Sequence, residues 1–168
     1  MKFTMTHVFD VERATMEKHL NDPELLEMAR EIPNLKGREL VEYREEAKLR
    51  IWKFRNAALG EIPANARLYV KPEMLAWTEE STWDPDTHAF TWRTVPSHFS
   101  EILSAEGTWR LEEAGAKTRR VIDGELRVKL PVVGRVVEQF IIELVKANFT
   151  AEAEVQRRFY AKIKGRTG

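Results

Sequence analysis

Hydrophobic and polar residues alternate strictly at the start of the chain. Phe3, Met5, His7 and Phe9 share one parity of the sequence, and mostly polar residues occupy the other. Successive side chains of a strand point to opposite faces, so this pattern predicts a half-buried strand. Similar alternation, rich in β-branched and aromatic residues, predicts six further strands within residues 38–47, 48–59, 75–96, 102–114 and 116–130. Turns are expected at 46–48, at 84–87 and at Gly115.

Two short helices are predicted between the first and second strands. Asp10 is positioned to cap a helix over residues 11–20, whose inward-facing residues would be Val11, Ala14 and Leu20. Asp22 and Pro23 then supply a cap and a first-turn proline for a second helix. Its apolar spacing is set by Leu25, Leu26, Met28 and Ile32, and residues 33–37 end it. The two helices would form a V-shaped brace.

The longest helical pattern follows the last strand. Pro131 and Gly134 interrupt the chain there, and neither Gly nor Pro occurs again until Gly165. Residues 134–163 therefore predict a helix of about 30 residues, roughly 45 Å long at 1.5 Å per residue. Its first half is apolar over a wide arc and its second half is amphipathic, so most of the remaining structure must surround it.

Residues 60–74 fit neither pattern. Pro63 and Pro72 flank a short apolar island from Leu68 to Val70. We expect an irregular connection here, with a bulged edge strand as the alternative. An exposed edge would offer a route to pairing between subunits, but the oligomeric state does not follow from the sequence.

The order of these elements indicates an α+β fold in a single domain, residues 1–168. Consecutive strands joined by short turns pair antiparallel, and a seven-stranded sheet with one apolar face must curve around an apolar partner. We expect the long C-terminal helix to lie across the concave face while the two short helices close one end. The alternative is a two-layer α+β sandwich with a filled core.

Composition narrows the possible functions. The 27 basic and 27 acidic residues give zero formal charge, which argues against binding nucleic acid through phosphate neutralisation. Cysteine is absent, so disulfides, thiolate metal sites and cysteine nucleophiles are excluded. No apolar run approaches the roughly 20 residues of a membrane span, and the first residues lack a secretion-signal pattern. We therefore expect a cytoplasmic protein without a transmembrane segment.

Basic residues gather near the C-terminus. They are Arg157, Arg158, Lys162, Lys164 and Arg166. We interpret them as a solvated helix face, with charge that suits the negative end of the helix dipole. Transient contact with an anionic membrane is the alternative.

The element order and three segments carry a family resemblance. The segments are EGTWRLEE, the turn AGAKT, and GELRVKLPVVGRVVEQFI. Together they resemble the START-like (polyketide cyclase, SRPBCC) superfamily with its helix-grip fold, and most resemble a bacterial branch of unknown function. In that branch a strand ending in a Val-Lys-x-Pro turn, here at Val128 to Gly134, leads into a helix start that contains a Glu, here Glu138. The resemblance implies a cavity between sheet and helix for an apolar or amphipathic ligand.

Residues in phase on the strands and on the first half of the long helix are candidates for the lining of that cavity. They are Met5, His7, Phe9, Trp52, Phe54, Trp77, Trp83, Phe90, Trp92, Trp109, Leu126, Val128, Val137, Phe140, Ile141 and Leu144. All five tryptophans fall in predicted strands. An indole buries a large area yet needs a partner for its N–H, which suits a pocket with a few polar groups. A purely aromatic core is the alternative for each of them.

Several polar residues lie within these apolar patterns. His7 is in phase with Phe3 and Phe9, where it would be a hydrogen-bonded internal histidine or a group that binds or protonates a ligand. Glu79 and Ser81 are in phase with the neighbouring tryptophans, and an exposed edge explains them equally well. Arg119 and Arg127 are out of phase with the apolar positions, so we expect them outside. His88 and His98 are expected at turns and rims.

The sequence shows no pattern that defines a reaction. The four histidines lack HExxH spacing, and there is no Gly-rich phosphate loop or GxSxG elbow, so we expect no metal and no cofactor. The function predicted is binding or transfer of a hydrophobic small molecule such as a lipid, fatty acid, quinone or polyketide. One alternative is a cyclase-, aromatase- or hydrolase-like enzyme that uses the same cavity. The other is a protein-interaction domain with a filled core.

Overall fold

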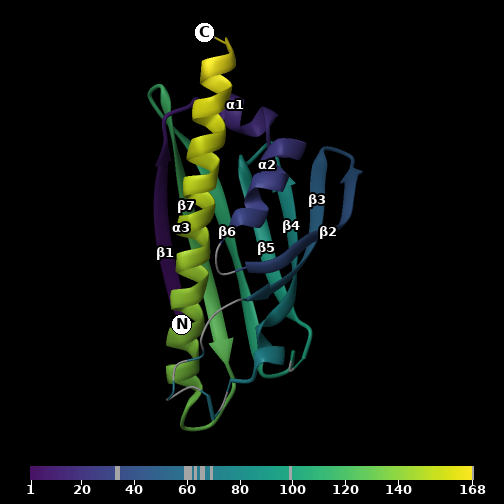
Figure 1. Cartoon of the computed structure of the whole chain (residues 1–168), viewed down its shortest axis with the longest axis vertical. Helices are drawn as coiled ribbons and strands as arrows, with labels where there is room; N and C mark the ends of the chain where they lie inside the picture. Colours follow the sequence, from purple (N-terminus) through teal and green to yellow (C-terminus); the bar gives the residue numbers. More distant parts are fainter. Residues whose placement is uncertain are drawn as a thin grey trace.

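The computed structural model of the chain describes residues 1–32, 35–58, 62, 64, 67–68, 70–98 and 100–167. Within those residues, seven strands form one antiparallel sheet, and a long C-terminal helix lies along it (Figure 1). The predicted α+β helix-grip architecture is confirmed. Of the predicted connection at 60–74, residues 60, 61, 63, 65, 66 and 69 lie outside the described residues, and residues 72–75 form a 3₁₀ turn, η2.

The strands follow the predicted order. They are β1 (Lys2–Phe9), β2 (Leu35–Glu46), β3 (Leu49–Ala58), β4 (Ala76–Asp84), β5 (Ala89–Pro96), β6 (Leu103–Ala114) and β7 (Lys117–Val128). Their order in the sheet is β1-β7-β6-β5-β4-β3-β2. Each strand from β2 to β6 therefore pairs with the strand that follows it, and β1 pairs with β7 at one edge.

The strand β1 is joined to β7 along its full length. Lys2 pairs with Glu125, and Phe9 pairs with Thr118. A side-chain bond strengthens the end of this pairing, because buried Thr118 Oγ1 donates to the Val11 carbonyl oxygen over 2.7 Å. Within this pairing, His7 lies directly opposite Arg120.

The two short helices follow β1, as predicted, but the first is shorter than expected. The helix α1 spans Arg13–Lys18, its N-cap is Glu12, and no side chain caps it, so the expected cap at Asp10 is wrong. Ala14 is exposed and Met16 is the buried residue, because the later start rotates the helix relative to the predicted inward face.

The second helix, α2 (Pro23–Met28), begins as predicted. Asp22 Oδ1 accepts from the Glu24 backbone N–H over 2.9 Å, which satisfies one of the free donors of the first turn. Leu25 is buried, and the helix continues into a 3₁₀ turn, η1 (Ala29–Glu31). In Figure 1 both helices lie beside α3 over the same face of the sheet.

The C-terminal helix α3 spans Gly134–Thr167, four residues beyond the predicted end. The Glu138 side chain accepts from the Val128 backbone N–H over 2.9 Å, and Gly134 N–H donates to the Leu130 carbonyl. These bonds fix the angle between the last strand and the helix. At the turn, Val132 has a positive φ of 68° and its side chain is fully exposed.

The predicted placement of charged residues on the outer face is confirmed at two sites. Arg119 pairs with Glu112 and Arg127 with Glu125, and both arginines are more than half exposed. The basic residues of α3 also have acidic partners: Arg158 pairs with Glu31, while Lys162 and Arg166 both pair with Glu24. These pairs connect the end of α3 to α2 and η1, as expected for a solvated helix face.

One row of residues crosses the inner face of the sheet from strand to strand. It runs Trp52, Ser81, Trp92, Gly107, Gly124, Phe3. In this row Ser81 separates the two tryptophans, and two adjacent glycines separate Trp92 from Phe3. A Cβ on Gly124 would lie 2.5 Å from Phe3 Cζ and 3.0 Å from Trp92 Cζ2, so the two aromatic rings occupy the space that the glycines leave. The row therefore fixes the position of the Trp92 indole on the sheet.

Candidate functional site: a cavity between sheet and helix

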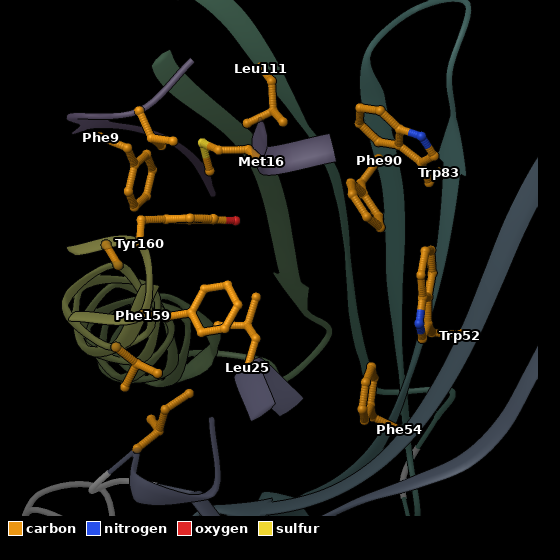
Figure 2. Packing of buried hydrophobic residues seen from close by; sticks show 14 of the residues in the cluster. Phe9, Met16, Leu25, Trp52, Phe54, Trp83, Phe90, Leu111, Phe159 and Tyr160 are labelled. Carbon is orange, nitrogen blue, oxygen red and sulfur yellow. The ribbon is translucent and has the colours of Figure 1, made fainter. Parts of the chain in front are cut away.

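A cavity of about 200 Å³ lies between the inner face of the sheet and α3. Figure 2 shows Tyr160 of α3 on one side of this space and Trp52, Phe54 and Phe90 of the sheet on the other. Met16 and Leu25 come from the short helices. The space extends along α3 to Leu144. Side chains therefore leave a void between sheet and helix, unlike the alternative of a filled core.

Nine of the sixteen candidate lining residues stand on the cavity wall. They are Trp52, Phe54, Trp77, Phe90, Trp92, Trp109, Leu126, Ile141 and Leu144. Glu79 and Ser81, in phase with the tryptophans of β4, are also on the wall. The wall is mainly apolar, and its polar groups come from a few positions on β2, β4, β5 and α3.

The other seven candidates lie away from this wall. They are Met5, His7, Phe9, Trp83, Val128, Val137 and Phe140. They have the expected parity or helical spacing but do not line the cavity, and Met5 and Phe140 are only partly buried. Phe9 packs edge-on against Tyr160, and Trp83 lies beneath Phe90 and Trp109. Val128 and Val137 belong to the packed cluster at the start of α3.

The second half of α3 contributes a part of the wall that the sequence analysis left out. Its members are Val145, Asn148, Phe149, Glu152, Val155, Gln156 and Tyr160. They continue the three- and four-residue spacing of Ile141 and Leu144, so the signal was present in the helical periodicity. The short helices add Met16, Leu20, Leu25, Leu26, Ala29 and Ile32, whose contact with the sheet depends on tertiary packing.

One polar cluster lies where β2, β3 and β4 meet. Arg38 donates to Asn56 Oδ1 over 3.1 Å and lies 3.6 Å from Glu79 Oε1. Its guanidinium also stands 4.2 Å from the centre of the Phe54 ring. Ser81 Oγ donates to Glu79 over 3.1 Å. The cation and the carboxylate on this side of the cavity are therefore paired with each other.

A second polar cluster surrounds Arg120, which is 0% exposed. One terminal nitrogen, Nη1, donates to Glu152 over 3.2 Å and to Gln156 over 3.3 Å. The other, Nη2, donates to the Phe149 carbonyl oxygen and to His7 Nδ1, both over 3.3 Å. Glu152 and Gln156 also stand on the cavity wall, so this cluster forms a polar part of its boundary.

Arg120 was missed in the sequence analysis although it has the parity of Ile122 and Leu126. An arginine is rarely buried unless it is paired, and its partners come from β1 and α3. Only the pairing of β1 with β7 places His7 beside it.

His7 is a buried internal histidine, 8% exposed, and it does not reach the cavity wall. Burial and, to a lesser degree, the positive charges of Arg120 and Arg157 lower the pKa of His7 to about 4. At neutral pH the ring is uncharged, and its Nδ1 accepts from Arg120 while the proton sits on Nε2. A role for His7 as acid or base toward a ligand is therefore not supported by its position.

Two polar atoms on the wall lack hydrogen-bond partners among the described residues. They are Trp92 Nε1, on a side chain that is 6% exposed, and Asn148 Oδ1. Trp52, on the same sheet face, differs because its Nε1 donates to Asn21 Oδ1 over 3.1 Å. The cavity therefore presents one unpaired hydrogen-bond donor and one unpaired acceptor. Leaving such buried atoms unpaired costs free energy, which a ligand that bonds to them would recover.

The part of the chain that the structure describes has neither a cluster of metal ligands nor a membrane-spanning helix. There, His, Asp and Glu residues form no cluster of three or more with the spacing of a metal site. In the same residues no helix combines the length and the hydrophobicity that crossing a bilayer requires.

A curved seven-stranded sheet with a long helix across it, and a cavity between the two, is the helix-grip fold of the START-like (polyketide cyclase) superfamily. Solved structures with this fold align over nearly the whole chain. The family profile described as "Protein of unknown function (DUF2505)" matches residues 4–159, and the chain belongs to this family. The resemblance drawn from the sequence is confirmed. No curated protein matches the sequence.

Three solved structures illustrate the range of proteins with this fold. Zhui aromatase/cyclase from Streptomyces sp. R1128 is 17% identical, with 95% of each chain covered and a TM-score of 0.63. A START superfamily protein from Mycobacterium smegmatis is 15% identical, with 93% of this chain and 97% of that chain covered and a TM-score of 0.57. Norcoclaurine synthase from Thalictrum flavum is 13% identical, with 92% and 86% covered and a TM-score of 0.58.

Proposed function

We propose that this protein reversibly binds a hydrophobic small molecule in the cavity between the sheet and α3. The observation that carries the proposal is the cavity itself, which has a mainly apolar wall built from three parts of the fold. Apolar surface left facing a cavity gains free energy when a ligand covers it, at about 25 cal/mol per Å². The cavity of about 200 Å³ is smaller than the roughly 300 to 1,000 Å³ of a typical drug-sized site, so a small ligand suits it best.

The first test is native mass spectrometry of freshly purified protein, followed by extraction and identification of bound molecules. We expect a mass excess that disappears on denaturation. A panel of fatty acids, quinones and small aromatic polyketides should then raise the melting temperature for the members that bind. Absence of both a bound molecule and any thermal shift across the panel would contradict the proposal.

A variant that fills the cavity separates specific binding from surface adsorption. Leu144 stands on the wall, and Leu144→Trp adds bulk to the space that a ligand would occupy. Val136, on the same helix but 45% exposed, provides the matched control Val136→Trp. Leu144→Trp should lose ligand binding while retaining a cooperative unfolding transition, and Val136→Trp should bind as the wild type does.

An enzyme that uses the same cavity is the second candidate. Two relatives are named for catalysis, an aromatase/cyclase and norcoclaurine synthase. Here the groups on the wall that could exchange a proton are Glu79 and Glu152, whereas His7 lies away from it. Turnover of a bound polyketide that is lost in Glu152→Gln or Glu79→Gln, but kept in His7→Gln, would favour the enzyme over the carrier.

A further inference from the structure

The unpaired hydrogen-bonding atoms of the cavity indicate which polar group a hydrophobic ligand would carry. Trp92 Nε1–H is a donor and Asn148 Oδ1 is an acceptor, and both are buried without a partner among the described residues. Trp92 comes from β5 and Asn148 from α3, so the two atoms belong to opposite sides of the cavity. A ligand between sheet and helix would be exposed to both.

The Trp92 side chain also lies beside the turn of α3 that carries Asn148. The Trp92 ring stands 6.0 Å from the ring of Phe149, the residue directly after Asn148. The Cζ2 edge of the indole packs into the space above Gly107 and Gly124, where neither residue has a side chain. This packing holds the ring in place. The position of the donor is therefore fixed by the sheet.

The charges around the cavity disfavour an anionic ligand. Both arginines near the wall are engaged: Arg38 with Asn56 and Glu79, and Arg120 with Glu152 and Gln156. The carboxylates on the wall, Glu79 and Glu152, would repel a ligand carboxylate. A buried charge needs a partner of opposite sign, and the described wall has no unpaired cation to provide one.

From these observations we propose that the ligand is an apolar alcohol or phenol whose single hydroxyl group accepts from Trp92 Nε1–H and donates to Asn148 Oδ1. A hydroxyl is one donor and an acceptor in the same small group, which matches the two atoms. The inference rests on the proposed binding function, since it names the ligand class of that same cavity.

The test compares three probes that differ in one group: naphthol, naphthalene and naphthoate, titrated calorimetrically into the full-length protein. Wild type should bind naphthol about tenfold more tightly than naphthalene, the size expected when a ligand hydrogen bond fills a site left unpaired. Naphthoate should bind more weakly than naphthol.

Two variants then locate the preference, with naphthalene as the internal reference for changes in shape. Trp92→Phe removes the donor and Asn148→Leu removes the acceptor while keeping similar bulk. Each should reduce the ratio of naphthol to naphthalene affinity to near one. Trp83→Phe removes an indole of the same sheet face that lies away from the wall, and it should leave the ratio as in the wild type.

Several results would overturn the inference. They are equal binding of naphthol and naphthalene to the wild type, a preference that survives in both Trp92→Phe and Asn148→Leu, tighter binding of naphthoate, or no binding of naphthol at all. None of these removes the proposed binding function, which the mass spectrometry and the wider panel decide. If that panel fails as well, both proposals fall together.

Discussion

Arg120 Nη2 lies 3.3 Å from His7 Nδ1, across the paired strands β7 and β1. Both side chains are buried, and the hydrogen bond requires an unprotonated Nδ1 on His7. A second positive charge on the histidine would face Arg120 directly. The chain therefore keeps His7 neutral, and this has a consequence for stability that can be measured.

Acid should destabilise the protein through His7. An unfolded histidine has a pKa near 6.5, whereas burial and Arg120 lower the folded pKa to about 4. Above pH 6.5 both states are neutral and the group has no effect. As the pH is lowered from 6.5 to 4, the unfolded state binds a proton that the folded state does not bind. The free energy of unfolding therefore decreases as the pH decreases, by roughly 3 kcal/mol at most.

The measurement is the free energy of unfolding in urea from pH 4 to 8, for wild type and His7→Gln. Glutamine retains an acceptor for Arg120 but does not titrate. The difference between the two proteins should therefore change most between pH 6.5 and 4. A difference that stays constant over that range would show that His7 is not held neutral by its surroundings.

Removing Arg120 should cost more alone than together with its carboxylate partner. Arg120→Met leaves Glu152 without its buried cation, and we expect a loss of about 2 to 4 kcal/mol. In Arg120→Met/Glu152→Leu the uncompensated carboxylate is gone, so the double variant should be at least about 1 kcal/mol more stable than the single one. Urea unfolding of both proteins measures this.

Arg119 provides the control for that pair. It is the neighbour of Arg120 on the outer face, and its side chain is 54% exposed and paired with Glu112. Arg119→Met should change the free energy of unfolding by less than about 0.5 kcal/mol. Equal effects at the two positions would contradict the view that burial makes Arg120 important.

The glycines beneath the aromatic rings should not tolerate a methyl group. On Gly107 a Cβ would meet the Asp123 carbonyl oxygen and lie 2.9 Å from Gly124 Cα, and backbone atoms have little room to move. On Gly124 it would meet the Phe3 ring, which can shift. We expect Gly107→Ala to cost more than Gly124→Ala, about 2 to 3 kcal/mol against about 1 to 2.

Thermal unfolding of these variants shows whether the loss of stability comes from steric crowding or from replacing any glycine. Gly165 of α3 has no atom within 4 Å of the position of an added Cβ, so Gly165→Ala should be neutral or stabilise by up to about 1 kcal/mol. A ranking with Gly165→Ala as the most harmful of the three would refute the packing argument.

Val132 should be replaceable with a gain in stability. Its φ of 68° is unfavourable for a β-branched residue, and its fully exposed side chain contributes no buried area. Val132→Gly should raise the free energy of unfolding by about 1 kcal/mol. Val95→Gly, at a strand position, should instead lower it by about 1 kcal/mol, and a loss at both sites would argue against strain at Val132.

The elements could be predicted from the sequence because their signals are local. Asp22 before Pro23 marks a helix start whatever surrounds it, and the absence of Gly and Pro after Gly134 allows a long helix. Alternation placed all five tryptophans in strands correctly. At Asp10 the same kind of signal failed, because the chain continues past it before α1 begins at Arg13.

The contacts of the site depended on information that the local pattern does not contain. Parity put Phe9 and Trp83 on the inner face, but parity does not say which inner residues α3 and its side chains cover. Phe9 is covered by Tyr160 and Trp83 by neighbouring rings, while Trp92 stays on the cavity wall. Arg120 had the right parity too, and its burial follows from partners distant in sequence.

The edge position of β1 has a consequence for synthesis on the ribosome. Lys2 through Phe9 are translated before the other strands, and their pairing partners, Thr118 through Glu125, follow more than 100 residues later. Until then β1 carries unpaired backbone donors and acceptors and an apolar face, the features that promote wrong association. The hairpins from β2 to β6 can form as they emerge, whereas the first strand must wait for β7, so closure of the sheet is expected among the late steps of folding.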